Sequence, residues 1–343
     1  MSRAFPDDLV ALLGRRRSVM PESGREMSHD EIMGLVAAAR ALIVTSGVAI
    51  DETLLAAAPR LQIVATAAVG YDNIDTAAAS RRGIWVSNTP EVVTEATADL
   101  ALLLLLAILR RAGEGFELVK HGEWRTPNPD ALWGHDPRDL TLGILGMGRI
   151  GKALARRVRV LGMPVIYHNR TRLTPEVEAT VEATWVSRDD LIHQADVISI
   201  HVPLSPSTRG MIGRAEFEAM RPGAILVNTA RGAIVDEHAL VEALTSGKLG
   251  GVGLDVFENE PRVPLALRRH PRAFLLPHVG TATTGTRRAM FKLAIDNVIE
   301  VLAGRPPLTP VATGPTSADT RESGRFGRPG STVRQPSPPT HSG

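Results

Sequence analysis

The chain has 343 residues, 43% of them apolar and 22% charged, so it is long enough for two domains of ordinary size. Its formal net charge is only +2 and its basic residues are scattered, which argues against a nucleic-acid-binding protein. It contains no cysteine, which excludes disulfides, thiolate metal sites and cysteine nucleophiles and fits a reducing compartment.

The first residues and the longest apolar run argue against a secreted protein and against a membrane-spanning one. Residues 1–14 contain no apolar signal core, so secretion is not indicated and a cytoplasmic location is expected. The run from Leu100 to Leu109 is closed by Asp99 and Arg110. As a helix it covers roughly 15 Å, about half of a bilayer core, so we expect it to be buried inside the protein.

Between the two ends, short apolar runs alternate with amphipathic segments of helical length, which is typical of a parallel α/β sheet. Strands are predicted at residues 41–45, 61–65, 84–86, 140–145, 165–168, 197–201, 224–228, 251–256 and 274–276. Helices are predicted in the gaps, where Ser187 with Asp190, and Asp236 with Gly247, have the positions of helix caps. A helix from about Val92 to Arg110 separates the strands into two groups and is a natural connector between domains. Residues 313–343 are rich in Pro, Ser, Thr, Gly and Arg, and we predict a disordered tail there.

A glycine-rich loop follows one of the predicted strands. The segment TLGILGMGRIGKALARRV places Gly146, Gly148 and Gly151 between this strand and the next helix. In the G-x-G-x-x-G spacing, glycines permit a tight turn, a close approach of backbone N–H groups to a pyrophosphate, and close packing of the helix on the sheet. A glycine-rich turn without a ligand is the alternative. The strand before it and the amphipathic helix after it favour dinucleotide binding.

The end of the next strand bears on which dinucleotide is bound. An NAD-binding unit usually carries Asp or Glu about 20 residues after the glycines, where it binds the adenosine ribose 2′-hydroxyl. Here that place is Asn169, and Arg170 and Arg172 follow. Asn does not repel a 2′-phosphate, and Arg can neutralise one through charge-assisted hydrogen bonds, although solvated loop arginines are the alternative. Because the acid is missing where bases are gained, we predict NADP(H) rather than NAD(H).

Three later segments each follow a predicted strand, so they should lie at the carboxyl edge of the sheet, where open α/β folds bind ligands. They are ILVNTARG with Arg231, LDVFENEP with Asp255 and Glu260, and LLPHVGTAT with His278. Singly they could be a surface cation, exposed loop carboxylates and a strand-end histidine. Together they supply what reduction of a 2-oxo acid needs. Arg binds the carboxylate and carbonyl, His donates the proton, and Glu260 is the candidate that orients His278 and favours its protonated form.

From about Phe5 to Pro310 the chain resembles the D-isomer-specific 2-hydroxyacid dehydrogenase family, and its pattern is most similar to the glyoxylate/hydroxypyruvate (2-ketogluconate) reductase branch. The matching segments, in order, are VGYDNID, NTPEVVTEATADLALLLLL, LGILGMGRIGKALARR, HVPLSPSTRGMIG, MRPGAILVNTARGAIVDEHALVEAL, GLDVFENEP and LLPHVGTAT. The resemblance implies that Arg231 binds substrate, that Glu260 orients the histidine and that His278 is the acid/base.

The resemblance also implies further site residues. Backbone N–H groups of Val69 and Gly70 would hold the substrate carboxylate, because a loop glycine permits close approach; a simple turn is the alternative. Asp255 would face the nicotinamide carboxamide, whereas by itself it would be interpreted as a cap. No metal site is predicted. The cofactor-lining residues implied besides the three glycines and Asp255 are Arg149, Ile150, Asn169, Arg170, Thr171, Arg172, Pro203, Thr229, Ala230, Arg231, His278 and Gly280.

The fold that the resemblance implies has two flavodoxin- or Rossmann-like α/β lobes with parallel sheets and a cleft between them. A dinucleotide-binding domain would span residues 92–284, and a discontinuous substrate-binding domain residues 1–91 with 285–312. Members open with an apolar strand before a helix, whereas this chain starts at or just before that helix, so the substrate lobe is expected to lack a strand. The last helix, residues 285–304, has apolar residues suited to packing on the first lobe. These are Met290, Leu293, Val298, Val301 and Leu302.

Family members are usually homodimers, with the helix of Leu100 to Leu109 near the interface; burial within the cofactor lobe is the alternative. We predict an NADPH-preferring reductase of small 2-oxo acids, glyoxylate or hydroxypyruvate first and 2-ketogluconate next. No nucleic-acid or membrane partner is predicted.

Two other functions are the alternatives to this one. One is an NAD-linked dehydrogenase acting on a substrate such as 3-phosphoglycerate. Asn169, Arg170 and the expected lack of a folded domain after residue 313 argue against this function. The other is a dinucleotide-sensing scaffold of corepressor type, which can keep the same catalytic residues. The intact catalytic set and carboxylate loop favour the enzyme.

Overall fold

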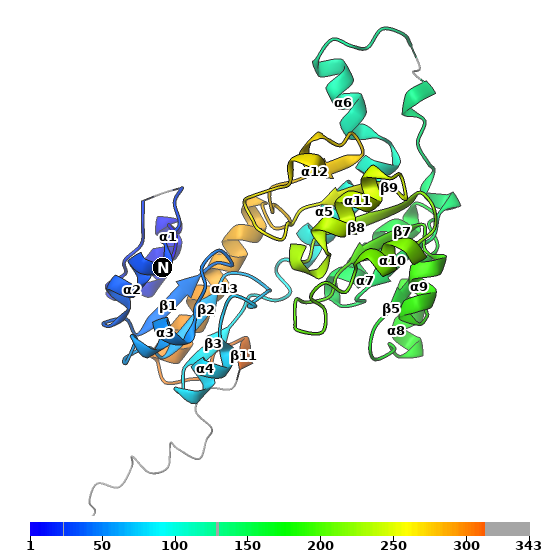
Figure 1. Ribbon diagram of the computed structural model, residues 1–343. Helices are drawn as coiled ribbons and strands as arrows, with labels where there is room; N and C mark the ends of the chain where they lie inside the picture. The colour runs from blue at the N-terminus through cyan, green and yellow to red at the C-terminus, as the bar shows by residue number, and fades with distance from the viewer. Residues whose placement is uncertain (23, 128–129, 313–343) are drawn as a thin grey trace, which may run out of the picture.

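Two sheets organise the protein, and each is the centre of its own α/β unit (Figure 1). The computed structural model describes residues 1–22, 24–127 and 130–312. The disordered tail predicted at residues 313–343 therefore lies outside the described residues. We refer to the two parts as the four-stranded unit and the seven-stranded unit.

The four-stranded unit has the strand order β1-β2-β3-β11. Strands β1 to β3 pair in parallel, and β11 pairs with β3 in the antiparallel direction. The strands are β1 (Ala41–Val44), β2 (Ile63–Thr66), β3 (Trp85–Ser87) and β11 (Pro310–Ala312). The helices are α1 (Asp7–Val10), the 3-10 helix η1 (Ala11–Leu13), α2 (His29–Val36), α3 (Glu52–Ala56), α4 (Thr76–Arg81) and α13 (Thr284–Leu302).

Three short helices of this unit begin at an acceptor side chain. Ser28, Asp51 and Asp75 each accept a hydrogen bond from the backbone N–H three residues later, at the starts of α2, α3 and α4. Such caps satisfy N–H groups that have no partner within the helix. The caps fix where each helix starts and so direct its apolar side toward the sheet.

Helix α13 comes from the far end of the chain and yet packs on β1 and β2. Phe291, Ile295 and Val298 form one apolar cluster with Ile43 and Ile63. The prediction that the last helix packs against the first lobe is confirmed. Figure 1 shows α13, in orange, beside the blue strands of the four-stranded unit, so the chain crosses between the units twice.

Residues at the start of the chain lie beside β1 without forming a regular strand. The Ser2 N–H donates to the carbonyl of Ile43 at 2.8 Å, and Arg3 forms an isolated antiparallel bridge with Glu26. Among the described residues, single backbone contacts therefore lie on this side of β1 in place of a regular strand.

The seven-stranded unit has the order β10-β9-β8-β7-β4-β5-β6, and every neighbouring pair is parallel. Its strands are β4 (Leu142–Leu145), β5 (Val165–His168), β6 (Ala183–Trp185), β7 (Val197–Ile200), β8 (Ala224–Asn228), β9 (Leu249–Leu254) and β10 (Ala273–Leu275). Its helices are α5 (Thr94–Leu109), α6 (Ala112–Lys120), α7 (Arg149–Val160), α8 (Pro175–Val181), α9 (Arg188–Gln194), α10 (Arg214–Ala219), α11 (Glu237–Thr245) and α12 (Leu265–Arg269), with 3-10 helices η2 (Asp130–Leu132), η3 (Pro137–Asp139) and η4 (Gly232–Ile234).

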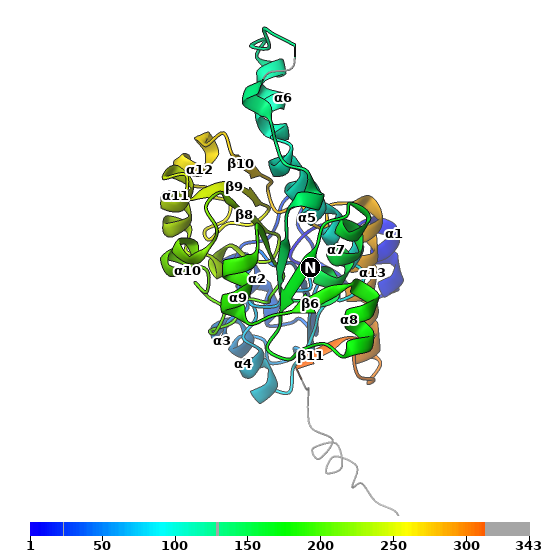
Figure 2. The same ribbon diagram turned by 90° about the vertical axis from the view of Figure 1, so that its right-hand side faces the viewer.

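Helices cover both faces of the larger sheet. One apolar cluster joins α5 and α7 to the sheet, and another joins α9, α10 and α11 to the opposite face. Figure 2 shows these two groups of helices on either side of the strands. The prediction of an α/β fold with parallel sheets and a Rossmann-like unit is confirmed.

The strand order places a ligand-binding position at the centre of this sheet. Strand β4 pairs on one side with β5, which follows it, and on the other with β7, to which the chain returns later. In open α/β sheets, ligands bind outside the carboxyl ends of the strands at such a reversal. The loop that starts at Gly146 follows β4 at this point.

Each predicted strand is present within two residues of its expected bounds, but β6 and β11 were not predicted. Both have three residues and lie at sheet edges. Strand β11 starts with Pro310, which has no N–H to donate and is tolerated only at an edge. Runs this short carry no alternating or continuous apolar pattern.

The long apolar helix α5 is mainly a core element, which was the alternative to a place at an interface. Ala101, Leu104, Leu105 and Leu109 are buried, while Leu103 remains exposed. Across the described ranges 1–22, 24–127 and 130–312, every helix is too short or too polar to span a bilayer. Helix α6 projects away from the body of the seven-stranded unit in both views (Figures 1 and 2).

Candidate functional site

The predicted acid and its predicted partner lie side by side. His278 follows β10, Glu260 follows β9, and Nδ1 of His278 is 2.7 Å from Oε2 of Glu260. The other carboxylate oxygen, Oε1, accepts from the Phe257 N–H at 3.0 Å. The two side chains are 36% and 35% exposed, so the imidazole remains open to a ligand on its other edge.

The charge of Glu260 follows from competing effects on its pKa. Burial alone raises the pKa, but the hydrogen bond to His278, the nearby charges and the Phe257 N–H outweigh it, so the pKa of Glu260 is lowered. The carboxylate is therefore ionised at neutral pH and accepts Nδ1–H of His278. Because Nδ1–H is held in this hydrogen bond, Nε2 is the nitrogen that can exchange a proton with a substrate.

Asp255 fixes the loop that carries the histidine. Its side chain is buried, and its two oxygens accept from the N–H groups of Val279 and Gly280, each at 2.7 Å. Burial raises the pKa of Asp255, and these two hydrogen bonds offset part of that rise. Asp255 thus has the capping role that was the alternative, and its orientation toward a nicotinamide carboxamide stays a prediction.

The predicted substrate arginine is held from two directions. Arg231 follows β8, its Nη1 donates to the carbonyl of Ala230 at 2.9 Å, and its Nε donates to Oδ1 of Asp72 at 3.0 Å. Asp72 belongs to the four-stranded unit, so this ion pair joins the two units. On the next residue, Gly232, a Cβ would lie 1.9 Å from the backbone carbon of Phe257, so only glycine lets the Arg231 loop pack this close to the Glu260 loop.

The loop predicted to hold a carboxylate lies against this guanidinium. A Cβ on Gly70 would be 1.7 Å from Nη2 of Arg231. The carbonyl of Val69 accepts from Nδ2 of Asn88 at 2.8 Å, which fixes the loop. Within the described part of the chain, the N–H groups of Val69 and Gly70 donate to no protein acceptor. The structure therefore gathers Val69, Gly70 and Arg231 at one place.

Two residues of this arrangement were not predicted, namely Asp72 and Asn88. Both lie in segments that carry the family resemblance, VGYDNID and NTPEVV. The local signal was weak in both cases: Asp72 is a polar residue two positions after Gly70, and Asn88 is a polar residue directly after β3. Contacts made across 159 residues of sequence, as between Asp72 and Arg231, have no local pattern.

The three glycines of the loop after β4 differ in their backbone conformation and in the space around them. Gly146 has φ of 102°, and a Cβ there would lie 2.7 Å from the backbone carbon of His201. A Cβ on Gly151 would lie 2.5 Å from the carbonyl oxygen of Gly146. Around Gly148 no atom lies within 4 Å of an added Cβ. This open place directly precedes the 12-residue helix α7, where backbone N–H groups suit a pyrophosphate.

The other residues expected to line a cofactor follow neighbouring strands. The hydroxyl of Thr229, directly after β8, is buried and has no hydrogen-bond partner among the described residues. An orphaned buried hydroxyl is the kind of group that a bound ligand satisfies. Arg149 pairs with Glu91 at 3.0 Å, Ile150 packs on the core, and the carbonyl of Pro203 accepts from Thr208. The residues present fit a dinucleotide.

Of the two arginines in the loop after β5, one is paired with an acidic side chain and the other is not, within the described residues. Arg172 Nε and Nη2 each lie 2.8 Å from an oxygen of Glu178, which also accepts from the hydroxyl of Tyr167. The hydrogen bond to Arg172, followed by that to Tyr167, lowers the pKa of Glu178 to about 2. Arg172 is thus already neutralised by an acid. Arg170 is exposed and forms no ion pair within the described residues.

Asn169 ties this loop to the glycine loop. Its Oδ1 accepts from the Met147 N–H at 2.7 Å, and its backbone carbonyl accepts from Nε1 of Trp185 at 3.2 Å. The neighbouring Thr171 is exposed. The residue that stands where NAD-binding units usually have an acid therefore braces the loop, and it adds no negative charge.

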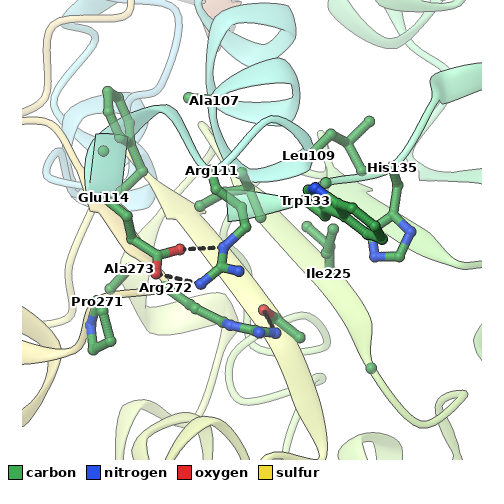
Figure 3. A pocket seen from close by; sticks show the side chains of 16 residues that line it. Ala107, Leu109, Arg111, Glu114, Trp133, His135, Ile225, Pro271, Arg272 and Ala273 are labelled. Atoms are coloured by element: carbon green, nitrogen blue, oxygen red, sulfur yellow. Dashed lines mark hydrogen bonds and ion pairs between the residues drawn. The ribbon is translucent and has the colours of Figure 1, made fainter. Parts of the chain in front are cut away.

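The cavity drawn in Figure 3 lies away from these residues. It encloses about 130 Å³ and is lined at the start of β8, β9 and β10, the amino edge of the sheet. Figure 3 shows the ion pair of Arg111 with Glu114 and the side chains of Trp133 and His135 at its wall. Ligands of open parallel sheets bind at the opposite edge, so the cavity is not the candidate active site.

Comparisons with known sequences and structures give the family of the chain. Residues 102–280 match the model of the D-isomer specific 2-hydroxyacid dehydrogenase, NAD binding domain. The glyoxylate reductase of Thermococcus gammatolerans is 42% identical over 315 residues, which cover 90% of this chain and 94% of that protein. The chain belongs to the D-isomer specific 2-hydroxyacid dehydrogenase family. It is therefore an NAD(P)-dependent oxidoreductase, and a nicotinamide dinucleotide is its cofactor.

Solved structures extend the likeness over both units. A protein of Thermus thermophilus has a TM-score of 0.83 and 43% identity, covering 91% of this chain and 98% of that one. The NADPH-dependent glyoxylate/hydroxypyruvate reductase of Sinorhizobium meliloti, solved in complex with NADP and malonate, has a TM-score of 0.80 and 35% identity. The match covers 91% of this chain and 95% of that one.

Proposed function

We propose that this family member is an NADPH-preferring reductase that converts small 2-oxo acids, such as glyoxylate and hydroxypyruvate, to D-2-hydroxy acids. The observation that carries the proposal is the convergence of three parts at the carboxyl edge of the larger sheet. These are the Gly70 loop, the guanidinium of Arg231 and the pair of Glu260 with His278. The names of the glyoxylate reductases that the chain resembles support the choice of substrate class.

The residues present account for each need of the reduction. The hydride that the carbonyl carbon receives would come from bound nicotinamide. Free backbone N–H groups at Val69 and Gly70 and the Nη edge of Arg231 can bind the substrate carboxylate. Nε2 of His278 donates the proton to the carbonyl oxygen, while the carboxylate of Glu260 holds Nδ1–H and stabilises the imidazolium. The side chain of His278 is 36% exposed, so it can regain its proton from solvent.

The preference for NADPH rests on the charge of the loop after β5. Arg170 is free to pair with a 2′-phosphate, Asn169 carries no charge, and Arg172 is engaged by Glu178. We therefore propose Arg170 as the main partner of that phosphate. The complex of the Sinorhizobium meliloti reductase with NADP is consistent with this cofactor.

One panel of initial rates tests the function. NADPH and NADH are each paired with glyoxylate, hydroxypyruvate, pyruvate and 2-ketogluconate, and kcat/KM is measured for every combination. We expect the highest values with NADPH and with glyoxylate or hydroxypyruvate. Equal or better rates with NADH would overturn the cofactor preference and favour an NAD-linked dehydrogenase. No turnover of any 2-oxo acid would favour a dinucleotide-sensing scaffold.

A His278→Asn variant completes the panel. It should bind NADPH as the wild type does, because the glycine loop is untouched, and should lose turnover by about 100-fold or more, since the proton donor is gone. Most of the kcat retained in this variant would remove His278 from the acid role.

We propose further that the chain is divided into domains at residues 91/92 and 284/285 and that it forms a homodimer. Support for the dimer comes from exposed apolar side chains on the projecting segment around α6, namely Phe116, Val119, Trp124 and Trp133. Light scattering coupled to gel filtration should give twice the mass of one chain, and a Val119→Asp variant should shift it toward one. A monomeric wild type would contradict the proposal.

A further inference from the structure

We infer that Asp72 is a positioning residue for the substrate arginine: its carboxylate fixes the guanidinium of Arg231 so that the Nη edge faces the Gly70 loop. The inference rests on the proposed function, because it assigns Asp72 a task in binding the 2-oxo acid. Asp72 belongs to the four-stranded unit and Arg231 to the seven-stranded unit, so their ion pair forms only where the two units meet.

The hydrogen bonds of Arg231 define its orientation. Nε donates to Oδ1 of Asp72 at 3.0 Å, and Nη1 donates to the carbonyl of Ala230 at 2.9 Å. A guanidinium is planar, so two bonds in different directions fix its plane. Nη2 makes no hydrogen bond within the described residues and lies where a Cβ of Gly70 would be. The donors left for a ligand therefore point at the loop whose N–H groups are also free.

The nitrogen of Arg231 that Asp72 binds decides whether Asp72 positions the guanidinium or competes with the substrate for it. A carboxylate on the Nη edge would occupy the place of the substrate. Asp72 binds Nε instead and leaves Nη2 free. The side chains of Arg231 and Asp72 are only 21% and 29% exposed, so water screens the pair less than it screens a surface pair.

Without Asp72, only the bond from Nη1 to Ala230 remains to orient the guanidinium. The long side chain would then sample several rotamers, and substrate binding would have to restrict them, which costs conformational entropy. The loss should appear mainly as a weaker affinity for the 2-oxo acid, with little effect on the affinity for NADPH. If Asp72 instead competed with the substrate for Arg231, its removal would free Arg231, and the KM for the 2-oxo acid would fall.

The test compares Asp72→Ala, Asp72→Asn, Arg231→Ala and the double variant Asp72→Ala/Arg231→Ala. The readouts are KM and kcat for glyoxylate at saturating NADPH, the Kd of oxamate for the NADPH complex by calorimetry, and the Kd of NADPH by fluorescence. Asp8→Ala is the matched control. It also removes an aspartate paired with an arginine, Arg288, but that pair is exposed and its hydrogen bonds reach none of the site residues.

We expect Asp72→Ala to raise the KM for glyoxylate and the Kd of oxamate about tenfold, with the Kd of NADPH within about twofold of wild type. Asp72→Asn keeps the acceptor oxygen and should restore most of the affinity. The double variant should be no worse than Arg231→Ala, because the two residues act as one unit. Asp8→Ala should behave as wild type.

Three outcomes overturn the inference: an unchanged or lower KM in Asp72→Ala, no rescue by Asn, or additive losses in the double variant. These are distinct from failure of the proposed function, in which the wild type itself turns over no 2-oxo acid. If the wild type is inactive but binds oxamate, the Kd series decides the role of Asp72. If the wild type neither turns over a 2-oxo acid nor binds oxamate, both proposals are wrong.

Discussion

The imidazole of His278 and the carboxylate of Glu260 meet at 2.7 Å although they follow two different strands of the larger sheet. Parallel strands deliver their carboxyl ends to one edge, so residues 18 positions apart become partners. The backbone at His278 has φ of 55°, in the left-handed region that a non-glycine residue adopts at some cost. Two backbone N–H bonds to Asp255 hold the next residues and stabilise this conformation.

The first prediction concerns the pH dependence of reduction. The pKa of Glu260 is lowered below its usual range, so its side chain is a carboxylate that accepts Nδ1–H of His278. Glu260→Gln removes this charge and the carboxylate acceptor that orients the ring, so kcat/KM should be lower than in the wild type at every pH. We expect kcat to drop by about tenfold or more as well. Profiles of kcat/KM from pH 5 to 9 test this, with Glu258→Gln as the neighbouring control. A profile that coincides with that of the wild type would refute the role of Glu260.

The second prediction concerns the cofactor. Arg170→Ala removes the one cation of the loop after β5 that is not already paired among the described residues. The KM for NADPH should rise about tenfold, since a charge-assisted hydrogen bond to the 2′-phosphate is lost, while the KM for NADH should stay within about twofold. Arg60→Ala, at another exposed arginine, is the control. Parallel changes for both cofactors would mean that Arg170 does not read the 2′-phosphate.

The third prediction contrasts two glycines three positions apart. Gly148→Ala places a methyl group in open space, so the unfolding midpoint should be unchanged while the Kd of NADPH increases. Gly151→Ala places it 2.5 Å from the carbonyl oxygen of Gly146, and the strain should cost about 1–3 kcal/mol of stability. Urea unfolding and NADPH titration of both variants give the four values. Destabilisation by Ala at 148, or none at 151, would contradict the assignment.

The fourth prediction concerns stability in acid. Desolvation of the His201 ring lowers its pKa to about 4, against 6.5 for an ordinary histidine. Between these values the unfolded chain binds the extra proton, so stability falls as the pH falls from 6.5 toward 4, by on the order of 1.4 kcal/mol per pH unit. His201→Asn should flatten this slope between pH 7 and 5 in urea unfolding, whereas exposed His238→Asn should not. Equal slopes in wild type and His201→Asn would exclude the ring as the source.

Much of this architecture could be predicted from the sequence because the relevant patterns are local. The glycine spacing before α7, the apolar runs of β4 and β8, and the caps at Ser187 and Asp236 are each set within a few residues. The set of Arg231, Glu260 and His278 could be proposed because each follows a strand and parallel strands end at one edge.

What could not be predicted depends on contacts between distant segments. The ion pair of Asp72 with Arg231 joins residues 159 positions apart and leaves no trace in either local segment. Arg172 and Glu178 are only six residues apart, but their pairing depends on the turn between β5 and α8 and not on a helical spacing. Strand β11 is defined by its partner β3 and not by its own three residues. Side-chain partners of this kind decide which of two neighbouring arginines is free.

The return of the chain to the four-stranded unit sets an order of assembly. All seven strands of the larger sheet are present once residue 275 has been synthesised, whereas β3 gains its outer neighbour only when residues 310–312 emerge. Helix α13 covers β1 and β2 equally late. The seven-stranded unit can therefore close first on the ribosome, and the segments before it must wait with an apolar sheet face and a strand edge uncovered. We expect this interval, more than the stability of the finished protein, to govern aggregation during expression.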